Sequence, residues 1–133
     1  MNEQQQAVAK ACLEGAEDGG MAFPQIVQTL MDAGFESYAI DFQRATASYY
    51  LPDGASIELP TGAMSTAVAP GFDAARMQAA IREAQQLVPG YTYKGFCEKA
   101  ALAGCARYIV SFSGRRALYI GRTAETHVEH FPD

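Results

Sequence analysis

Residues 23–51 read FPQIVQTLMDAGFESYAIDFQRATASYYL, and residues 93–121 read YKGFCEKAALAGCARYIVSFSGRRALYIG. The two stretches align without a gap, at a constant offset of 70. Few residues are identical, but apolar residues recur in the same order, and Ala33-Gly34 falls on Ala103-Gly104. Repetition at a fixed period predicts that the chain is an internal duplication.

Each repeat has the pattern of helices followed by strands. Apolar residues at 23, 26, 27, 30 and 31 follow the spacing of an amphipathic helix. Gly34 then predicts its end, because glycine readily takes the left-handed conformation that stops a helix. Tyr38, Ile40 and Phe42 alternate with polar or small residues, which indicates a half-buried strand. We expect further strands at 45–51 and 55–59, and a preceding helix in each repeat, at about 3–15 and 73–87.

The predicted fold is therefore α+β, in one domain over residues 1–133. Two α-α-β-β-β repeats, at about 3–60 and 73–132, are joined by a connector at 60–72. We expect one mainly antiparallel sheet with the helices on one face and a pseudo-two-fold axis between the repeats. The connector, PTGAMSTAVAPGF, contains Met64, Val68 and Phe72, and we expect part of it to pack against the domain.

Composition narrows the functional classes. The net charge of −5 argues against a nucleic-acid binder, and no apolar run approaches the length of a membrane span. The beginning of the chain lacks a signal-peptide pattern, so we expect a cytoplasmic protein. The three cysteines, Cys12, Cys97 and Cys105, have neither zinc-site spacing nor an even count, and we expect no disulfide. Residues 1–89 carry four basic and eleven acidic groups, and residues 90–133 carry six and four, so the charge is uneven along the chain.

Several motifs resemble one known family. They are Ala-Gly after an apolar helix, Tyr-Ala-Ile-Asp-Phe at 38–42, Thr-Ala-Ser-Tyr-Tyr-Leu-Pro-Asp-Gly at 46–54 and His-Phe-Pro at 130–132. Together they resemble the YbcV-like family of bacterial, often prophage-associated proteins of unknown function, some of which are labelled phage envelope proteins. The resemblance implies a bacterial or phage source, with association with a virion as one role. It implies no reaction and no catalytic residues.

No motif predicts catalysis, a cofactor or a metal. His127 and His130 are interleaved with glutamates, but residues three apart on a strand point to opposite faces and cannot chelate one ion. One alternative is a small-molecule-binding protein or an enzyme with a site in the cleft between the repeats. Its ligand-binding residues would be Arg107, Arg115, Tyr119 and His127.

The hypothesis that we favour is a non-catalytic binding or assembly module, phage- or prophage-related, whose partner is a second copy or another protein. If Ser113-Gly114 closes a short hairpin, Tyr108 pairs with Tyr119 and Val110 with Ala117. Ile109, Leu118 and Ile120 then share the face away from the helices, flanked by Arg107 and Arg116. Something should cover these aliphatic side chains. The candidates are the connector and, as we prefer, a second copy in a homodimer.

Overall fold

The computed structural model describes residues 1–62 and 64–132, so Ala63 of the connector and Asp133 lie outside the described residues. The α-α-β-β-β order occurs twice. The elements are α1 (Glu3–Asp18), α2 (Phe23–Asp32), β1 (Ser37–Asp41), β2 (Thr46–Tyr50), β3 (Ser56–Pro60), α3 (Ala74–Gln86), α4 (Tyr93–Leu102), β4 (Cys105–Ser111), β5 (Arg116–Gly121) and β6 (Thr126–His130). We refer to residues 3–60 as the first half and 73–132 as the second half.

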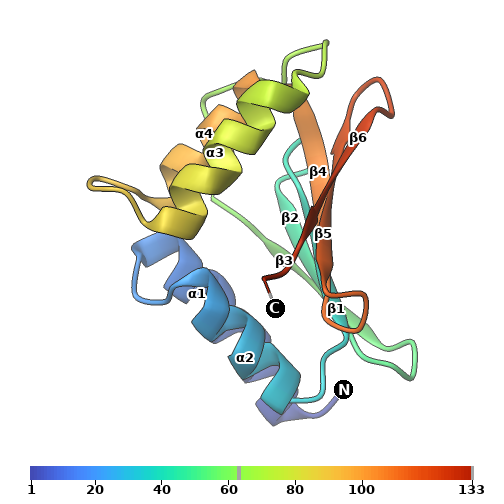
Figure 1. Cartoon of the computed structure of the whole chain (residues 1–133). Helices are drawn as coiled ribbons and strands as arrows, with labels where there is room; N and C mark the ends of the chain where they lie inside the picture. The colour runs from blue at the N-terminus through green and yellow to red at the C-terminus, as the bar shows by residue number, and fades with distance from the viewer. Residues whose placement is uncertain (63, 133) are drawn as a thin grey trace.

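The six strands form one antiparallel sheet in the order β3-β2-β1-β4-β5-β6. The four helices of the described residues lie on one side of it, and none of them covers the other side (Figure 1). The predicted α+β class and the single helical face are therefore confirmed. Because β3 and β6 form the two edges, the halves meet along β1 and β4 in the middle of the sheet.

The seam between β1 and β4 has a symmetric register. Ala39 faces Ile109 at its centre, and these two positions are 70 residues apart. The backbone N–H of Phe42 donates to the carbonyl of Ala106 at one end, and that of Phe112 donates to Glu36 at the other (2.9 and 3.0 Å). The sheet is thus continuous across the halves, and its contacts fit the expected pseudo-two-fold axis. A common origin of the halves stays a prediction, which superposition of 23–51 on 93–121 would test.

Local signals set the limits of the helices. Side chains of Asn2, Asp73 and Thr92 accept hydrogen bonds from the first turns of α1, α3 and α4. Gly34 and Gly104 follow α2 and α4 with φ of +97° and +90°, so both glycines end a helix as predicted. At Gly104 a Cβ would also overlap the backbone of Gly71, which makes glycine necessary there for a second reason.

The first hairpin turns of the two halves use equivalent positions. Asp41 Oδ1 accepts from the N–H of Arg44 (2.9 Å), and Ser111 Oγ, 70 residues later, accepts from Gly114 (3.0 Å). Ala45 and Arg115 both take a left-handed φ, of +55° and +51°. A short polar acceptor thus shapes both turns, and serine replaces aspartate in the second.

The core lies between the sheet and the helices. The residues on its sheet side that are 7% exposed or less include Tyr38, Ile40, Ala47, Tyr49, Tyr108, Val110, Phe112, Ala117 and Tyr119. Phe42, which alternates with them in the sequence, packs against this core and is half-buried. The pairs Tyr108–Tyr119 and Val110–Ala117 are formed, so the predicted hairpin register is confirmed. Leu30 of α2, Met77 of α3 and Ala100 of α4 close the core from the helical side, each with no exposed surface.

The connector packs on the helical side of the sheet. Val68 contacts Ala101 and Ala106, and Ala69 donates its N–H to the carbonyl of Ala101 (2.9 Å). Phe72 lies against the backbone of Gly121, a residue buried on the same side. The connector and a second copy of the chain were the two candidates to cover Ile109, Leu118 and Ile120. The described part of the connector does not cover them, because it lies on the helical side of the sheet.

Candidate functional site

The most distinctive surface is the side of the sheet that no helix covers, which we call the open face (Figure 1). Its side chains form three cross-strand rows. From β3 to β6 they are Ser56, Tyr50, Ser37, Ser111, Arg116 and His130; Glu58, Ser48, Ala39, Ile109, Leu118 and Val128; and Pro60, Thr46, Asp41, Arg107, Ile120 and Thr126.

The middle row turns apolar at the seam and stays apolar to the edge of the second half. We call Ala39, Ile109, Leu118 and Val128 the apolar row. Ile109 and Val128 are 37% and 39% exposed, while Leu118 and the adjacent Ile120 are half-buried. Side chains of this size are usually covered when they stand side by side. The apolar row therefore marks a surface for contact.

The two halves of the open face also differ in charge. The first half presents Asp41 and Glu58, and the second half presents Arg107 and Arg116. Within the described residues the ion pairs are Lys99–Glu83 and His127–Glu129, so none of these four charges is paired in that part of the chain. Unpaired charges of opposite sign on the two halves can be used by a partner.

A shallow hollow of about 210 Å³ lies on the open face across β2, β1 and β4. The small side chains of Ala39, Thr46 and Ser48 line it. Longer side chains also line it, among them Asp41, Arg44, Arg107 and Ile109. Tyr50 and Glu58 line it as well. The hollow thus spans the seam between the halves, and it contains one of the four ligand-binding residues expected from the sequence.

The four expected ligand-binding residues do not form one site. Tyr119 and His127 are cross-strand neighbours on the helical side, with ring centroids 6.4 Å apart. Arg107 lies on the open face, because alternate residues of β4 point to opposite sides of the sheet. Arg115 lies in the hairpin turn, where its Nη2 donates to the carbonyl of Pro132 (3.1 Å). A cleft lined by all four is therefore wrong.

His127 belongs to a small polar group between β6 and α3. Its Nε2 lies 3.2 Å from Glu129 Oε2, and Gln85 Nε2 of α3 donates to Glu129 Oε1 (3.4 Å). His130 lies on the open face instead, in the row of Arg116. The two histidines therefore face opposite sides, as predicted. Within residues 1–62 and 64–132, no three metal-ligating side chains come together.

Tyrosines and cysteines fill the centre of the core. The hydroxyls of Tyr93 and Tyr108 are 2.7 Å apart, and burial raises the pKa of both well above its ordinary value. Burial raises the pKa of Cys97 to about 12 and that of Cys105 to about 11. Thiols with such pKa values are protonated at neutral pH and are poor nucleophiles. All three cysteines are free and buried, so the expectation of no disulfide holds.

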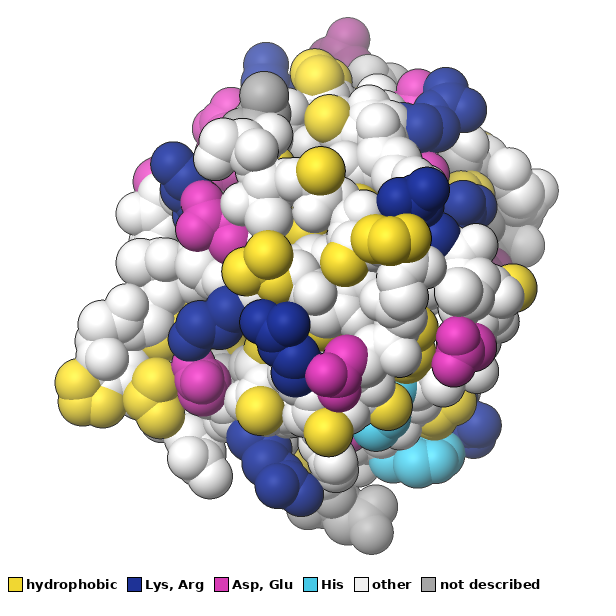
Figure 2. Space-filling model, turned by 90° about the horizontal axis from the view of Figure 1, so that it is seen from above, with side chains coloured by type: hydrophobic (Ala, Val, Ile, Leu, Met, Phe, Trp, Pro, Cys, Tyr) yellow, Lys and Arg dark blue, Asp and Glu magenta, His cyan; other side chains and the backbone are white. Residues whose placement is uncertain are grey.

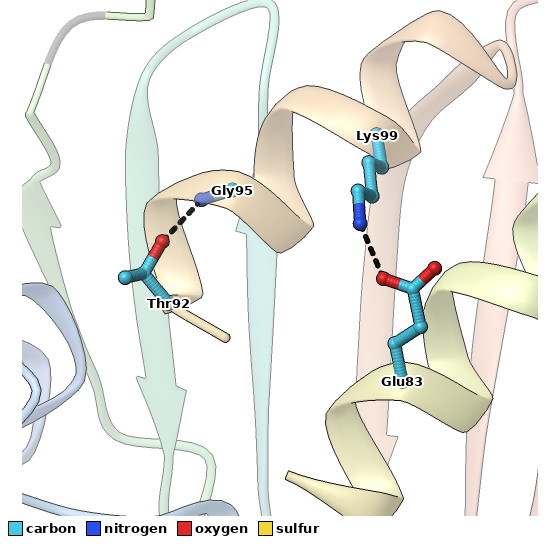
Figure 3. A network of polar contacts seen from close by, with 4 residues as sticks. All are labelled: Glu83, Thr92, Gly95 and Lys99. Atoms are coloured by element: carbon cyan, nitrogen blue, oxygen red, sulfur yellow. Dashed lines mark hydrogen bonds and ion pairs between the residues drawn. The ribbon is translucent and has the colours of Figure 1, made fainter. Parts of the chain in front are cut away.

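A second hollow, of about 220 Å³, lies between α3 and α4 where their connecting loop turns back. Thr92 caps α4 by accepting from the N–H of Gly95 (3.0 Å), and Lys99 pairs with Glu83 of α3 (Figure 3). The first contact caps α4 itself, and only the second joins α4 to α3. Among the described residues that line the hollow, the charged ones are Glu83 and Lys99, which pair with each other.

Charges of both signs cover the end of the molecule that is seen from above. In Figure 2, basic and acidic side chains alternate with separate apolar patches, and the histidine side chains lie together at one side. This end is an ordinary mixed surface. No helix among the described residues has the length and apolar character that crossing a membrane requires.

Fold and site together define an α+β protein with one helix-covered sheet face and one bare, charged and partly apolar face. The chain belongs to the family described as protein of unknown function (DUF1398), whose model matches residues 13–129. A search of curated proteins finds no match.

The sequence predicted the exposed apolar side chains of β4 and β5, but it did not predict three other residues of the open face. Val128 completes the apolar row from β6, and Arg44 and Glu58 complete the hollow. The alternation of Thr126, Val128 and His130 was the available signal for Val128. Arg44 and Glu58 carried no such signal, because their place in the hollow depends on which strands are neighbours.

Proposed function

We propose that this chain is a non-catalytic assembly module that binds a second copy of itself through the open face of the sheet. The observation that carries the proposal is the apolar row, which crosses from the seam to the edge and is covered neither by a helix nor by the described connector. Ile109 and Val128 at 37% and 39% exposed are its clearest members.

The energy available from covering this row is substantial. Burying an aliphatic side chain of this size contributes about 1.5–3 kcal/mol when it starts fully exposed. Ile109, Leu118, Ile120 and Val128 are partly covered already, so each contributes a fraction of that amount. A contact between two copies uses every one of them twice, since a two-fold interface buries the same patch on both subunits.

The size of the open face also suits a dimer. Six strands about 4.8 Å apart and five residues at about 3.3 Å each give a face of about 29 by 17 Å. Its flat projection is about 490 Å² per copy, and side-chain relief increases the accessible area. Two copies would bury about 980 Å² by this projection, which is at the low end of specific protein–protein interfaces.

The experiment is sedimentation of the wild-type protein and of a double variant, Ile109→Asp with Leu118→Asp. We expect a wild-type dimer and a folded monomeric variant, because four buried carboxylates per dimer would oppose contact. The control pair, Met31→Asp with Leu87→Asp, changes apolar residues that are 47% and 55% exposed on the helices, and it should leave the dimer intact. A monomeric wild type, or a folded double variant that still dimerises, would contradict the proposal.

A second candidate function is supported by the hollow on the open face. It has a volume of about 210 Å³ and lies on the seam, and two arginines, Arg44 and Arg107, and two carboxylates, Asp41 and Glu58, line it. The arginines can bind a carboxylate or phosphate group of a small molecule. This is the small-molecule-binding or enzymatic alternative, with the site in the hollow of the open face and not in a cleft lined by Arg107, Arg115, Tyr119 and His127. A thermal-shift screen of carboxylates and phosphates tests it: binding raises the melting temperature. Arg107→Gln should abolish the rise, and no rise with any anion would reject this candidate.

We also propose a YbcV-like, phage- or prophage-related role in a bacterial cytoplasm, with association with a virion as its alternative. The support is the residue pattern at 38–42, 46–54 and 130–132. Fractionation of producing cells and mass spectrometry of purified phage particles distinguish the two locations. Absence from both the cytoplasm and the particles would count against this role.

A further inference from the structure

The second half of the open face is complementary in shape to the first half of the open face on another copy. The second half presents the larger aliphatic side chains, Ile109, Leu118 and Ile120. The first half presents small side chains at the matching rows, Ala39, Ser48 and Thr46, and these are among the residues that line the hollow. The hollow also reaches Arg107 and Ile109 of β4. When the two different halves meet, the larger side chains of β5 on one copy, Leu118 and Ile120, fit over the β2 side of the hollow on the other.

Two simple orientations of a two-fold dimer differ in which halves they bring together. An axis parallel to the strands and above the seam at Ala39 and Ile109 places the first half of one copy over the second half of the other. Leu118 then faces Ser48 of the partner subunit, and Arg107 faces the partner's Asp41. An axis perpendicular to the strands places each half over itself, so Leu118 faces Leu118 of the partner subunit.

The charges favour the first orientation. It brings Arg107 over the partner's Asp41 and Arg116 over the partner's Tyr50, a suitable ring for a guanidinium. The partner's Glu58 then lies over Val128, one strand and one row away from Arg116. The second orientation keeps Arg107 beside Asp41 of its own chain at the seam, but it places each Arg116 next to the partner's Arg107. Like charges placed together oppose binding.

We infer that the copy bound at the open face is rotated about an axis along the β1–β4 seam, so that the second half of each copy occupies the hollow of the other. This arrangement rests on the proposed self-association. It leaves no room for a separate ligand in the hollow of the dimer.

The experiment is cysteine cross-linking of the full chain with a short bis-maleimide. Ser48→Cys and Leu118→Cys are made separately, mixed in equal amounts and compared with each variant alone. We expect the mixed product, which joins position 48 of one copy to position 118 of the other, in at least tenfold excess over the product that joins position 118 to itself. The native cysteines are buried, and the wild-type protein reports any reaction at them. Lys10→Cys, on an exposed helical position, reports random collisions.

The outcomes separate the proposed dimer from the proposed orientation of its two copies. An excess of the product that joins position 118 to itself, or no cross-link above the Lys10→Cys background, overturns the arrangement, while the sedimentation result for the wild-type protein still decides the dimer. A monomeric wild-type protein in sedimentation overturns both.

A charge exchange gives an independent measurement. Glu58→Arg should weaken the dimer at least tenfold, because the new arginine lies over the partner's Val128 and comes close to the partner's Arg116. Adding Arg116→Glu to the same chain should restore most of the affinity. If each half packed on itself, Glu58 of one copy would face Glu58 of the partner subunit. Glu58→Arg would then replace a pair of negative charges by a pair of positive charges, and the affinity would not fall. An unchanged affinity for Glu58→Arg would therefore also overturn the arrangement.

Discussion

Glycines with a left-handed backbone conformation contribute to the stability of the fold. Gly104 has a φ of +90°, and a Cβ there would overlap the carbonyl oxygen of Gly71. Gly54 has a similar φ of +93° but open space around it. The two glycines separate the cost of backbone conformation from the cost of a steric overlap.

We expect Gly104→Ala to lower the free energy of unfolding by about 2–4 kcal/mol, since it adds overpacking to backbone strain. Gly54→Ala should cost only about 1 kcal/mol, for strain alone. Urea denaturation of both variants measures the difference. Equal losses would show that the connector moves away from Gly104 at no cost.

A substitution at Ala45 should raise the free energy of unfolding, whereas the two glycine substitutions lower it. Its φ of +55° is unfavourable for alanine, and its place in the first turn leaves the side chain half-buried. We expect Ala45→Gly to raise the free energy of unfolding by about 0.5 kcal/mol, the strain relieved being partly offset by the greater entropy of unfolded glycine. Ala33→Gly, at a φ of −84°, is the control and should not stabilise the protein. Thermal melting of both variants tests this.

At the scale of elements, the hairpins could be predicted and the seam could not. The positions of Tyr108 and Tyr119 follow from alternation and from a short turn at Ser113-Gly114, all within a few residues of one another. The pairing of Ala39 with Ile109 joins distant parts of the chain, and nothing in either strand specifies the other as its neighbour. The hollow depends on that pairing, which is why the sequence alone does not mark Arg44 and Glu58 as candidate site residues.

The layer between helices and sheet carries a prediction about alkaline pH. Burial raises the pKa of Cys97 from 9.0 to about 12, and the pKa values of Tyr93 and Tyr108 are raised too. A folded pKa above the unfolded one means that the unfolded state loses its proton first as the pH rises. Stability is therefore complete below pH 9 and declines between pH 9 and pH 12.

Each such group lowers the free energy of unfolding by up to about 1.4 kcal/mol per pH unit within its window. Urea denaturation at pH 8, 9.5 and 10.5 should show the decline. In Cys97→Ala the stability is lower at every pH, but its slope between pH 9.5 and 10.5 should be shallower than that of the wild type. Identical slopes would mean that the thiol gains access to water in the folded protein.

For the whole molecule, the helix-covered face and the open face have separate tasks. The covered face holds the core and the buried tyrosines, which account for stability. The open face holds the apolar row, the unpaired charges and the hollow, which account for the proposed binding. Substitutions on the open face should therefore change association and leave folding nearly unchanged, as the Ile109→Asp and Leu118→Asp pair will show.

The seam has a consequence for the order in which the chain folds. The ladders β1–β2, β2–β3, β4–β5 and β5–β6 join strands that are consecutive in the sequence, whereas β1–β4 closes a loop that contains β2, β3, α3 and α4. Closing a long loop costs more conformational entropy than closing a short one. The hairpins can therefore form early, and docking of the two halves along Ala39 and Ile109 is the slow step that sets the folding rate.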